Sequence, residues 1–198
     1  MLRQFRPALV LLLVMTGLTG LAYPLAVTGV AAILFPYQSN GSLIEQHGKV
    51  IGSVLIGQNF TQERYFHGRP SATTDTDPNN ASKTIAAPYN AGNSGGSNAG
   101  PTSKALIDRI ATDVAALKKD NAVPIPVDLV TTSASGLDPD ITPAAAEFQA
   151  ARVAAARHLP VEKLRALVAQ ATENRSFGIF GEPRVNVLKL NLALDAIK

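Results

Sequence analysis

The sequence contains no cysteine and no tryptophan, and only three of its 198 residues are histidines. Without cysteine the chain can form no disulfide, no thiolate metal site and no cysteine nucleophile. The histidines, His47, His67 and His158, are scattered and do not show the short spacing of zinc ligands. These absences leave no metal site that the sequence would predict.

A strong excess of one charge is also missing. The chain has 18 Lys and Arg against 15 Asp and Glu, and two of the basic residues, Arg3 and Arg6, lie in a short N-terminal leader. The remainder is close to neutral, so it lacks the basic surface of a nucleic-acid-binding domain, and no nucleic-acid partner is predicted. The pattern G-x-x-x-x-G-K-[ST] is absent, so no Walker-type nucleotide site is predicted either.

What the sequence does have is a long apolar run, residues 8–35, without a charged side chain. As a helix this run would be about 42 Å long, whereas the hydrocarbon core of a bilayer is about 30 Å thick. We therefore predict one transmembrane helix. Pro24 lies near its middle and predicts a kink, while Gly17 and Gly20 predict a small-residue side on which another membrane helix can pack.

The alternative for this run is a cleaved signal peptide, because Arg3 and Arg6 resemble its basic leader. The apolar part of a signal peptide is only about 7–15 residues long, which favours an uncleaved span. The same arginines precede the span, and the first charge after it is Glu45, so we expect the N-terminus in the cytoplasm. The predicted organisation is a cytoplasmic leader (1–7), a transmembrane helix (8–35) in the plasma (inner) membrane, in contact with lipid, and an extracytoplasmic domain (36–198).

The patterns after the span predict an α+β fold, with one mixed α/β domain that contains a long Gly/Asn/Ser-rich loop. Residues 43–60 read as a β-hairpin, and residues 71–103 as the loop. Apolar residues at helical spacing predict three helices, which start near Thr102, Thr142 and Pro160. Short strands are predicted at 129–132 and 184–187. The tail from Leu188 fits the spacing of a strand and of a helix, and a short strand followed by a helix is favoured.

Two motifs in the polar tract suggest chemistry but lack the context that it needs. Residues 92–96 fit the serine-hydrolase pattern G-x-S-x-G around Ser94, yet polar coil is predicted on both sides where a strand and a helix are required. A membrane-anchored extracytoplasmic serine hydrolase is nevertheless kept as an alternative function, as is a ligand-binding module. Residues 75–86 begin like a calcium loop, but Asn80 and Ala86 replace its Gly and Glu, so a turn is predicted.

Taken together, several segments resemble the KdpC family, the small C subunit of the bacterial potassium-transporting P-type ATPase. The matching segments are GSVLIGQ (52–58), YFHGRPS (65–71), SGGSN (94–98), VDLVT (127–131), SASGLDP (133–139) and RVNVL (184–188). One departure is Asp140, where the family usually has histidine, so this chain carries a carboxyl group there instead of an imidazole.

The resemblance implies a non-catalytic accessory subunit of an ATP-driven, high-affinity potassium uptake pump. The family is also assigned a part in raising the pump's nucleotide affinity, and the predicted topology allows only an indirect effect through the span. Our leading hypothesis is that the chain stabilises the complex and caps the outer potassium entrance, because its oxygen-rich loop suits a hard cation. The implied partners are a channel-like potassium-translocating subunit, a P-type ATPase catalytic subunit and a small hydrophobic subunit. ATP, Mg and potassium would act at those partners, because this chain lacks the Asp-Lys-Thr-Gly phosphorylation motif.

No catalytic, cofactor or metal residue is therefore predicted in this chain. The residues predicted to contact other subunits are Gly17, Gly20, Pro24, Gly57, Tyr65, Phe66, Arg69, Ser94, Gly95, Gly96, Asn98 and Asp138.

Overall fold

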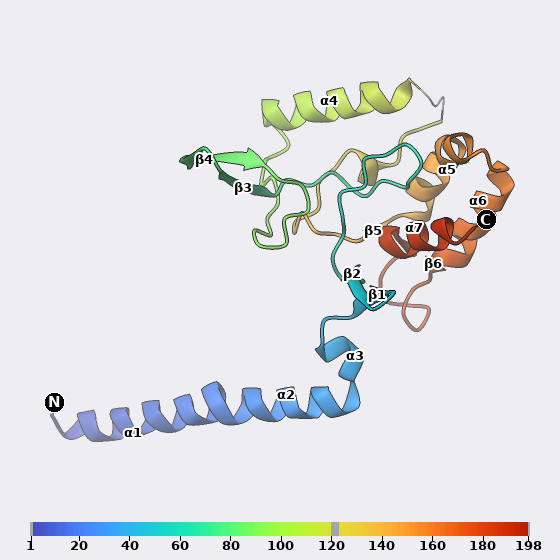
Figure 1. Ribbon diagram of the computed structural model, residues 1–198. Helices are drawn as coiled ribbons and strands as arrows, with labels where there is room; N and C mark the ends of the chain where they lie inside the picture. The colour runs from blue at the N-terminus through green and yellow to red at the C-terminus, as the bar shows by residue number, and fades with distance from the viewer. Residues whose placement is uncertain (1, 120–122, 198) are drawn as a thin grey trace. The chain divides into compact units, whose positions relative to one another are not determined.

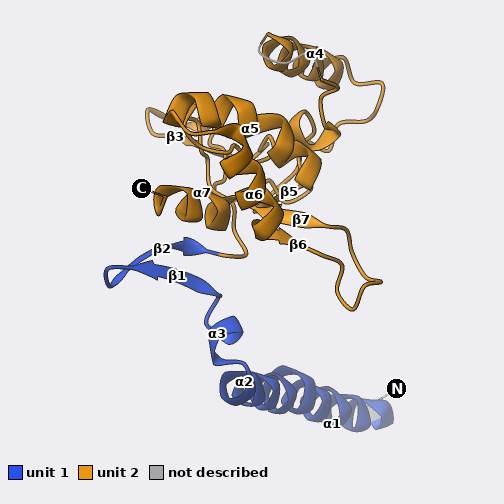
Figure 2. Cartoon of the chain, turned by 90° about the vertical axis from the view of Figure 1, so that its right-hand side faces the viewer, with its two compact units in different colours: residues 1–53 blue, residues 54–198 orange. Residues whose placement is uncertain are grey.

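The computed structural model describes residues 2–119 and 123–197 of the chain (Figure 1). Met1 and Lys198, the outer ends of the predicted segments 1–7 and 36–198, lie outside the described residues. The chain divides into two compact units, residues 1–53 and residues 54–198 (Figure 2). The fold is α+β, with one apolar N-terminal helix and a mixed α/β body.

Unit 1 begins with the long apolar helix. A short 3-10 turn, η1, leads into a continuous helical stretch over Phe5–Leu34 (Figure 1). None of the residues in this stretch is buried. By its length and composition this stretch can cross a membrane. The segments along it are η1 (Leu2–Gln4), α1 (Phe5–Met15), the π-helical η2 (Thr16–Ala22) and α2 (Tyr23–Leu34).

Pro24 does not end this helix. The π-helical turn lies immediately before it, and there the Tyr23 N–H donates to the Leu18 carbonyl, one residue further back than in an α-helix. The Thr19 hydroxyl also donates to the Met15 carbonyl, at 2.7 Å. The wider turn and the threonine thus accommodate the proline within the helix.

The rest of unit 1 is a short helix, α3 (Pro36–Ser39), and the hairpin of β1 (Leu43–Gln46) and β2 (Lys49–Ser53). The strands pair antiparallel around His47 and Gly48, both of which have positive φ. Such φ values match the turn types that fit the twist of a two-residue hairpin. The predicted hairpin is confirmed for residues 43–53, whereas residues 54–60, which were predicted to belong to it, are turn and coil.

Unit 2 is built on a three-stranded antiparallel sheet with the order β5-β7-β6, against which three helices pack (Figure 2). The strands are β5 (Asp140–Ile141), β6 (Thr172–Glu173) and β7 (Arg184–Asn186), and the helices are α5 (Pro143–Arg157), α6 (Val161–Ala171) and α7 (Val187–Asp195). Their apolar sides form the core, which includes Phe66, Ile141, Val153, Leu164, Val185, Leu190 and Leu194.

The helices of this core begin where the sequence predicts. Thr142 caps α5, since its Oγ1 accepts the Ala145 N–H at 3.1 Å, and Pro143 occupies the first turn. Helix α6 follows Pro160 and buries Leu164 and Val168. The C-terminal stretch is a short strand followed by a helix, as predicted.

Two predictions for the connecting segments are wrong. Residues 129–132 are not a strand: Leu129 ends a 3-10 turn, η3 (Val127–Leu129), and residues 130–132 continue as turn and coil, with the Thr131 hydroxyl donating back to the Val127 carbonyl. The polar tract 71–103 is not irregular throughout, since it contains an antiparallel hairpin of β3 (Thr74–Asp77) and β4 (Asn80–Ala86). All of β4 is exposed, so no alternation of apolar residues marked it in the sequence.

A third difference concerns α4 (Lys104–Lys118), which starts after Ser103 rather than at a Thr102 cap. None of its residues is buried, although Leu106, Ile110 and Val114 are partly covered. Arg109 ties the helix to the body by donating to the Val130 carbonyl at 3.1 Å.

The turn predicted near the start of the polar tract 71–103 is confirmed, because the Asp77 carboxylate accepts the Asn79 N–H at 2.8 Å.

Candidate functional site

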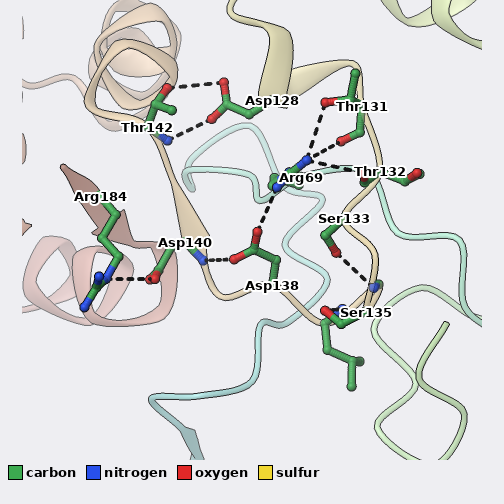
Figure 3. A network of polar contacts seen from close by, with 12 residues as sticks. Arg69, Asp128, Thr131, Thr132, Ser133, Ser135, Asp138, Asp140, Thr142 and Arg184 are labelled. Carbon is green, nitrogen blue, oxygen red and sulfur yellow. Dashed lines mark hydrogen bonds and ion pairs between the residues drawn. The ribbon is translucent and has the colours of Figure 1, made fainter. Parts of the chain in front are cut away.

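Many of the predicted contact residues meet where several loops of unit 2 converge. We call residues 57, 69–73, 87–96 and 131–140 the loop cluster. It contains Gly57, Arg69, Ser94, Gly95, Gly96 and Asp138 from the predicted set, and Figure 3 shows part of its polar network.

Arg69 links two segments of the loop cluster (Figure 3). Its Nη1 lies 2.9 Å from Asp138 Oδ2, with both side chains about three-quarters covered, and its Nη2 donates to the Thr132 carbonyl at 3.3 Å. Its Nε is buried without a hydrogen-bond partner among the described residues. Nη2 also lies 3.5 Å from the carbonyl and the hydroxyl oxygen of Thr131, so the guanidinium is held by one ion pair and by longer hydrogen bonds to Thr131 and Thr132.

Tyr89 holds the backbone of Arg69. Its hydroxyl donates to the Arg69 carbonyl at 2.7 Å. Burial, and next the nearby charge of Asp138, raise the pKa of Tyr89 to about 12. The phenol is thus a protonated hydrogen-bond donor at neutral pH and fixes the backbone of residue 69.

Two hydroxyl groups join the loops further along. The Ser71 hydroxyl donates to the Gly136 carbonyl at 2.7 Å and accepts the Tyr89 N–H at 3.0 Å. The Thr73 hydroxyl donates to the Ala87 carbonyl at 2.6 Å and accepts the Asn90 N–H at 3.1 Å. Three loops that are distant in sequence are thereby cross-linked through side chain–backbone bonds.

Two glycines permit this close approach. A Cβ on Gly57 would lie 2.5 Å from Tyr89 Cε1 and 2.6 Å from the Asp138 carbonyl oxygen. A Cβ on Gly136 would lie 2.5 Å from Thr73 Cγ2, and its φ of +66° disfavours any side chain. Neither position can accept a larger residue unless the loops move apart.

The Gly-Gly segment lies against residues 133–135. The Gly95 N–H donates to the Ser135 carbonyl at 2.9 Å, and a Cβ on Gly96 would lie 2.9 Å from the Ala134 carbonyl oxygen. The Ser94 hydroxyl donates to the same Ser135 carbonyl at 3.0 Å. Ser94 thus has a backbone partner where a nucleophile needs a base, and coil surrounds it, so the geometry does not support the serine-hydrolase alternative.

Asp140, the departure from the family pattern, lies at the edge of the loop cluster. Its carboxylate is 3.2 Å from Arg184 Nε (Figure 3). It also accepts a hydrogen bond from Asn186 at 3.2 Å. Burial raises its pKa, and the charge of Arg184 opposes that shift. In this chain the position therefore holds a carboxylate that pairs with β7.

The remaining predicted residues lie outside the loop cluster. Asn98 is exposed and has a φ of 49°. In unit 1, a Cβ on Gly17 would meet no atom within 4 Å, and one on Gly20 would meet only Thr16 Cγ2 at 3.9 Å. Pro24 lies at the start of α2. The glycine side of the helix is open to a neighbour.

Tyr65 and Phe66 precede the loop cluster and are held by the helices. Phe66 is fully buried, and the Asn191 side chain on α7 accepts its N–H and donates to its carbonyl, both at 2.9 Å. Tyr65 donates its hydroxyl to Asp195 at 3.0 Å, and the Arg157 guanidinium lies 4.9 Å from its ring centre. Phe66 is thus a core residue that positions the segment, whereas Tyr65 keeps some exposed surface.

A second amide repeats this arrangement. Gln149 on α5 accepts the His67 N–H at 2.8 Å and donates to the His67 carbonyl at 3.1 Å. Sequence reasoning missed Gln149, Asn191 and Tyr89. The two amides could have been found in the sequence, because each lies on an otherwise apolar helix face, where a buried polar side chain needs a hydrogen-bond partner. Tyr89 carried no such signal.

The described residues hold no group of three or more His, Cys, Asp or Glu side chains arranged to bind a metal ion. What the loop cluster offers is a set of rigidly positioned hydroxyl, amide and carbonyl groups. Such a surface suits a contact with another protein or a weak interaction with a hard cation, and it lacks the groups of a catalytic site.

Comparison with known proteins gives one family. Residues 5–196 match the family described as KdpC: K+-transporting ATPase, c chain. The Potassium-transporting ATPase KdpC subunit of Bradyrhizobium diazoefficiens is 66% identical over 196 residues, which cover 98% of each chain. The subunits of the same name from Methylobacterium nodulans and Rhodopseudomonas palustris (strain BisB18) are each 65% identical, covering 100% of this chain and 98% and 100% of their own.

Proposed function

This chain belongs to the KdpC family of K+-transporting ATPase c chains, and we propose that its second unit lies outside the membrane and caps the potassium entrance of the pump. As a family member it is a non-catalytic accessory subunit of a potassium-transporting ATPase in the membrane. The proposal concerns where its body lies and which residues make the contacts.

The orientation rests on charge. Arg3 precedes the apolar stretch Phe5–Leu34, and Arg6 is the second residue of that stretch. The first charged residue after the stretch is Glu45. Positively charged flanks stay in the cytoplasm, so residues 36–198 would be extracytoplasmic and residues 1–7 cytoplasmic. The transmembrane part would then be residues 8–35, in direct contact with lipid.

The observation that carries the capping role is the cross-linked loop cluster. Its loops are tied by the Arg69–Asp138 pair, the Ser71 and Thr73 hydroxyls and the close approach at Gly57 and Gly136. A surface that is already ordered loses little entropy on binding, which favours a specific contact. The Gly/Asn/Ser-rich loop, with Ser94 in the loop cluster and Asn98 just beyond it, is rich in hydroxyl and carbonyl oxygens, the groups that suit a potassium path.

The proposed partners are a channel-like potassium-translocating subunit under the cap, a P-type ATPase catalytic subunit and a small hydrophobic subunit. ATP, Mg and potassium would act at those partners. With this orientation the second unit and the bound nucleotide lie on opposite sides of the membrane. Any effect on ATP affinity would therefore be indirect, through the span.

The span would be the second contact element and would help to stabilise the complex. Gly17 and Gly20 have no chain atom close to their missing Cβ positions, apart from one Thr16 methyl group at 3.9 Å from Gly20. Small residues allow two membrane helices to approach closely, and the π-helical turn before Pro24 adds a local irregularity that a plain anchor does not need.

Co-purification tests this proposal. Pump subunits are recovered through a tag on this chain, in which Gly17 and Gly20 are both changed to leucine. We expect the yield of the other subunits to fall while membrane insertion is unchanged, because the added bulk blocks helix contact. The change Ala26→Leu, at an exposed small residue of the same helix, is the control and should leave the yield intact. Full recovery with the double variant would refute the contact role of the span.

A further inference from the structure

The loop between β6 and β7 exposes a cluster of large apolar side chains. It extends away from the helices of unit 2 (Figure 2). Phe177 is 93% exposed, Ile179 71% and Phe180 66%. We call residues 176–181 the apolar tip. Single exposed apolar residues are common, but three large ones on one short loop mark an interaction site.

The apolar tip is a preformed structure. Its base is closed by Ser176 and Phe180, whose backbones exchange hydrogen bonds of 2.8 and 3.0 Å. Within it, Phe177 has a φ of 54°, a conformation that is unfavourable for a bulky residue. Strain of this kind, at a side chain that no core holds, is typical of positions kept for a function. The turn therefore presents its apolar side chains without further ordering.

The base of the loop indicates what kind of surface the tip meets. Each basic residue in 172–189 pairs with a carboxylate: Arg175 with Glu182 at 2.6 Å, Arg184 with Glu173 at 3.1 Å, and Lys189 with Glu173 at 3.0 Å. Arg184 also pairs with Asp140 at 3.2 Å. Segments that insert into lipid usually add cations that reach the anionic headgroups. Here the cations are already neutralised.

An uncharged aromatic tip on a neutral base instead matches the centre of a protein interface, where aromatic residues are enriched and charges depleted. We infer that the apolar tip docks into an uncharged apolar pocket of another subunit of the pump. This inference rests on the proposed function, because it takes the extracytoplasmic unit to lie against a partner subunit.

The absence of native cysteine allows a direct test. Ile179→Cys retains both phenylalanines, and Ile107→Cys on α4, at a position 53% exposed, is the matched control. Each variant is expressed alone and together with the other pump subunits. Labelling with a membrane-impermeant maleimide is then measured in spheroplasts and in broken membranes.

In broken membranes we expect the thiol of the Ile179→Cys variant to react about tenfold more slowly when the other subunits are present, as for a side chain in a desolvated interface core. The thiol of the Ile107→Cys control should react equally in both cases. Protection at position 179 in the chain expressed alone would indicate insertion into lipid and would overturn the inference, as would full reactivity with and without the other subunits. If the control thiol at position 107 reacts only after the membranes are broken, the proposed orientation fails, yet the protection result still decides the docking.

Assembly provides an independent readout. Changing both Phe177 and Phe180 to serine removes exposed side chains, so the thermal unfolding of the chain alone should not change. Truncation of an interface anchor typically costs about 2 kcal/mol or more, equivalent to about a 30-fold loss of affinity, so co-purification of the other subunits should drop. Ile107→Ser is the control. Unchanged recovery with the double variant would refute the docking.

Discussion

The amide of Asn191 gives the sharpest test of how the segment before the loop cluster is held. The side chain is 1% exposed and forms two 2.9 Å hydrogen bonds with the backbone of Phe66. Asn191→Leu keeps a similar size but leaves a buried N–H and a buried carbonyl without partners. Each unsatisfied group costs about 1–3 kcal/mol, so for the two groups we expect a loss of about 2–6 kcal/mol in the free energy of unfolding.

For a chain of this size, such a loss lowers the melting temperature by about 5–20 °C. The assay is thermal unfolding of the full chain in detergent, followed by circular dichroism. Asn174→Leu makes the same chemical change at an exposed position and should stay within about 0.5 kcal/mol of the wild type. If Asn191→Leu melted together with this control, the two hydrogen bonds would not be holding residue 66.

Three further changes test other parts of the account. Gly136→Ala should destabilise unit 2 by about 1–3 kcal/mol in denaturant unfolding, because the residue has positive φ and its Cβ would clash with Thr73; an unchanged midpoint would contradict the close approach. Burial raises the pKa of Asp140, so the folded state binds that proton more tightly than the unfolded state, and stability from this group is lost as pH rises through the raised pKa. The free energy of unfolding of Asp140→Asn, measured relative to that of the wild type, should therefore be higher at pH 7 than at pH 4. The opposite trend would refute the assignment. Protease added to spheroplasts should digest the chain from Leu43 onward and spare a label at Arg3; protection until the membranes are broken would reverse the orientation.

Local signals in the sequence were enough to predict the elements whose cause is local. The apolar run, the cap at Thr142 with Pro143 after it, and the stripe of Leu164 and Val168 each fix a helix within a few residues. The His47-Gly48 turn likewise fixes the hairpin of unit 1. In these cases the residues that determine the structure are neighbours along the chain.

The errors arise where distant contacts or solvent exposure decide. Residues 129–132 have strand-forming side chains, but arginine side chains take up their carbonyls instead of a neighbouring strand. Arg69 donates to the carbonyls of Thr131 and Thr132, and Arg109 donates to that of Val130. The exposed strand β4 has no buried face, so no period of two appears in its sequence. The matched family segments were visible as motifs, yet their meeting depends on pairs such as Ser71 with Gly136, 65 residues apart, which no local pattern shows.

A bulky group attached to the exposed loop tests whether the second unit caps the potassium entrance. Asn98→Cys places one reactive group on the exposed Gly/Asn/Ser-rich loop of a chain that has no other cysteine, and Ala111→Cys on α4 is the exposed control. Potassium uptake by the assembled pump is measured before and after a bulky, membrane-impermeant maleimide is attached. The account predicts that modification at position 98 strongly reduces uptake while modification at position 111 does not. Equal uptake with both positions fully modified would contradict it.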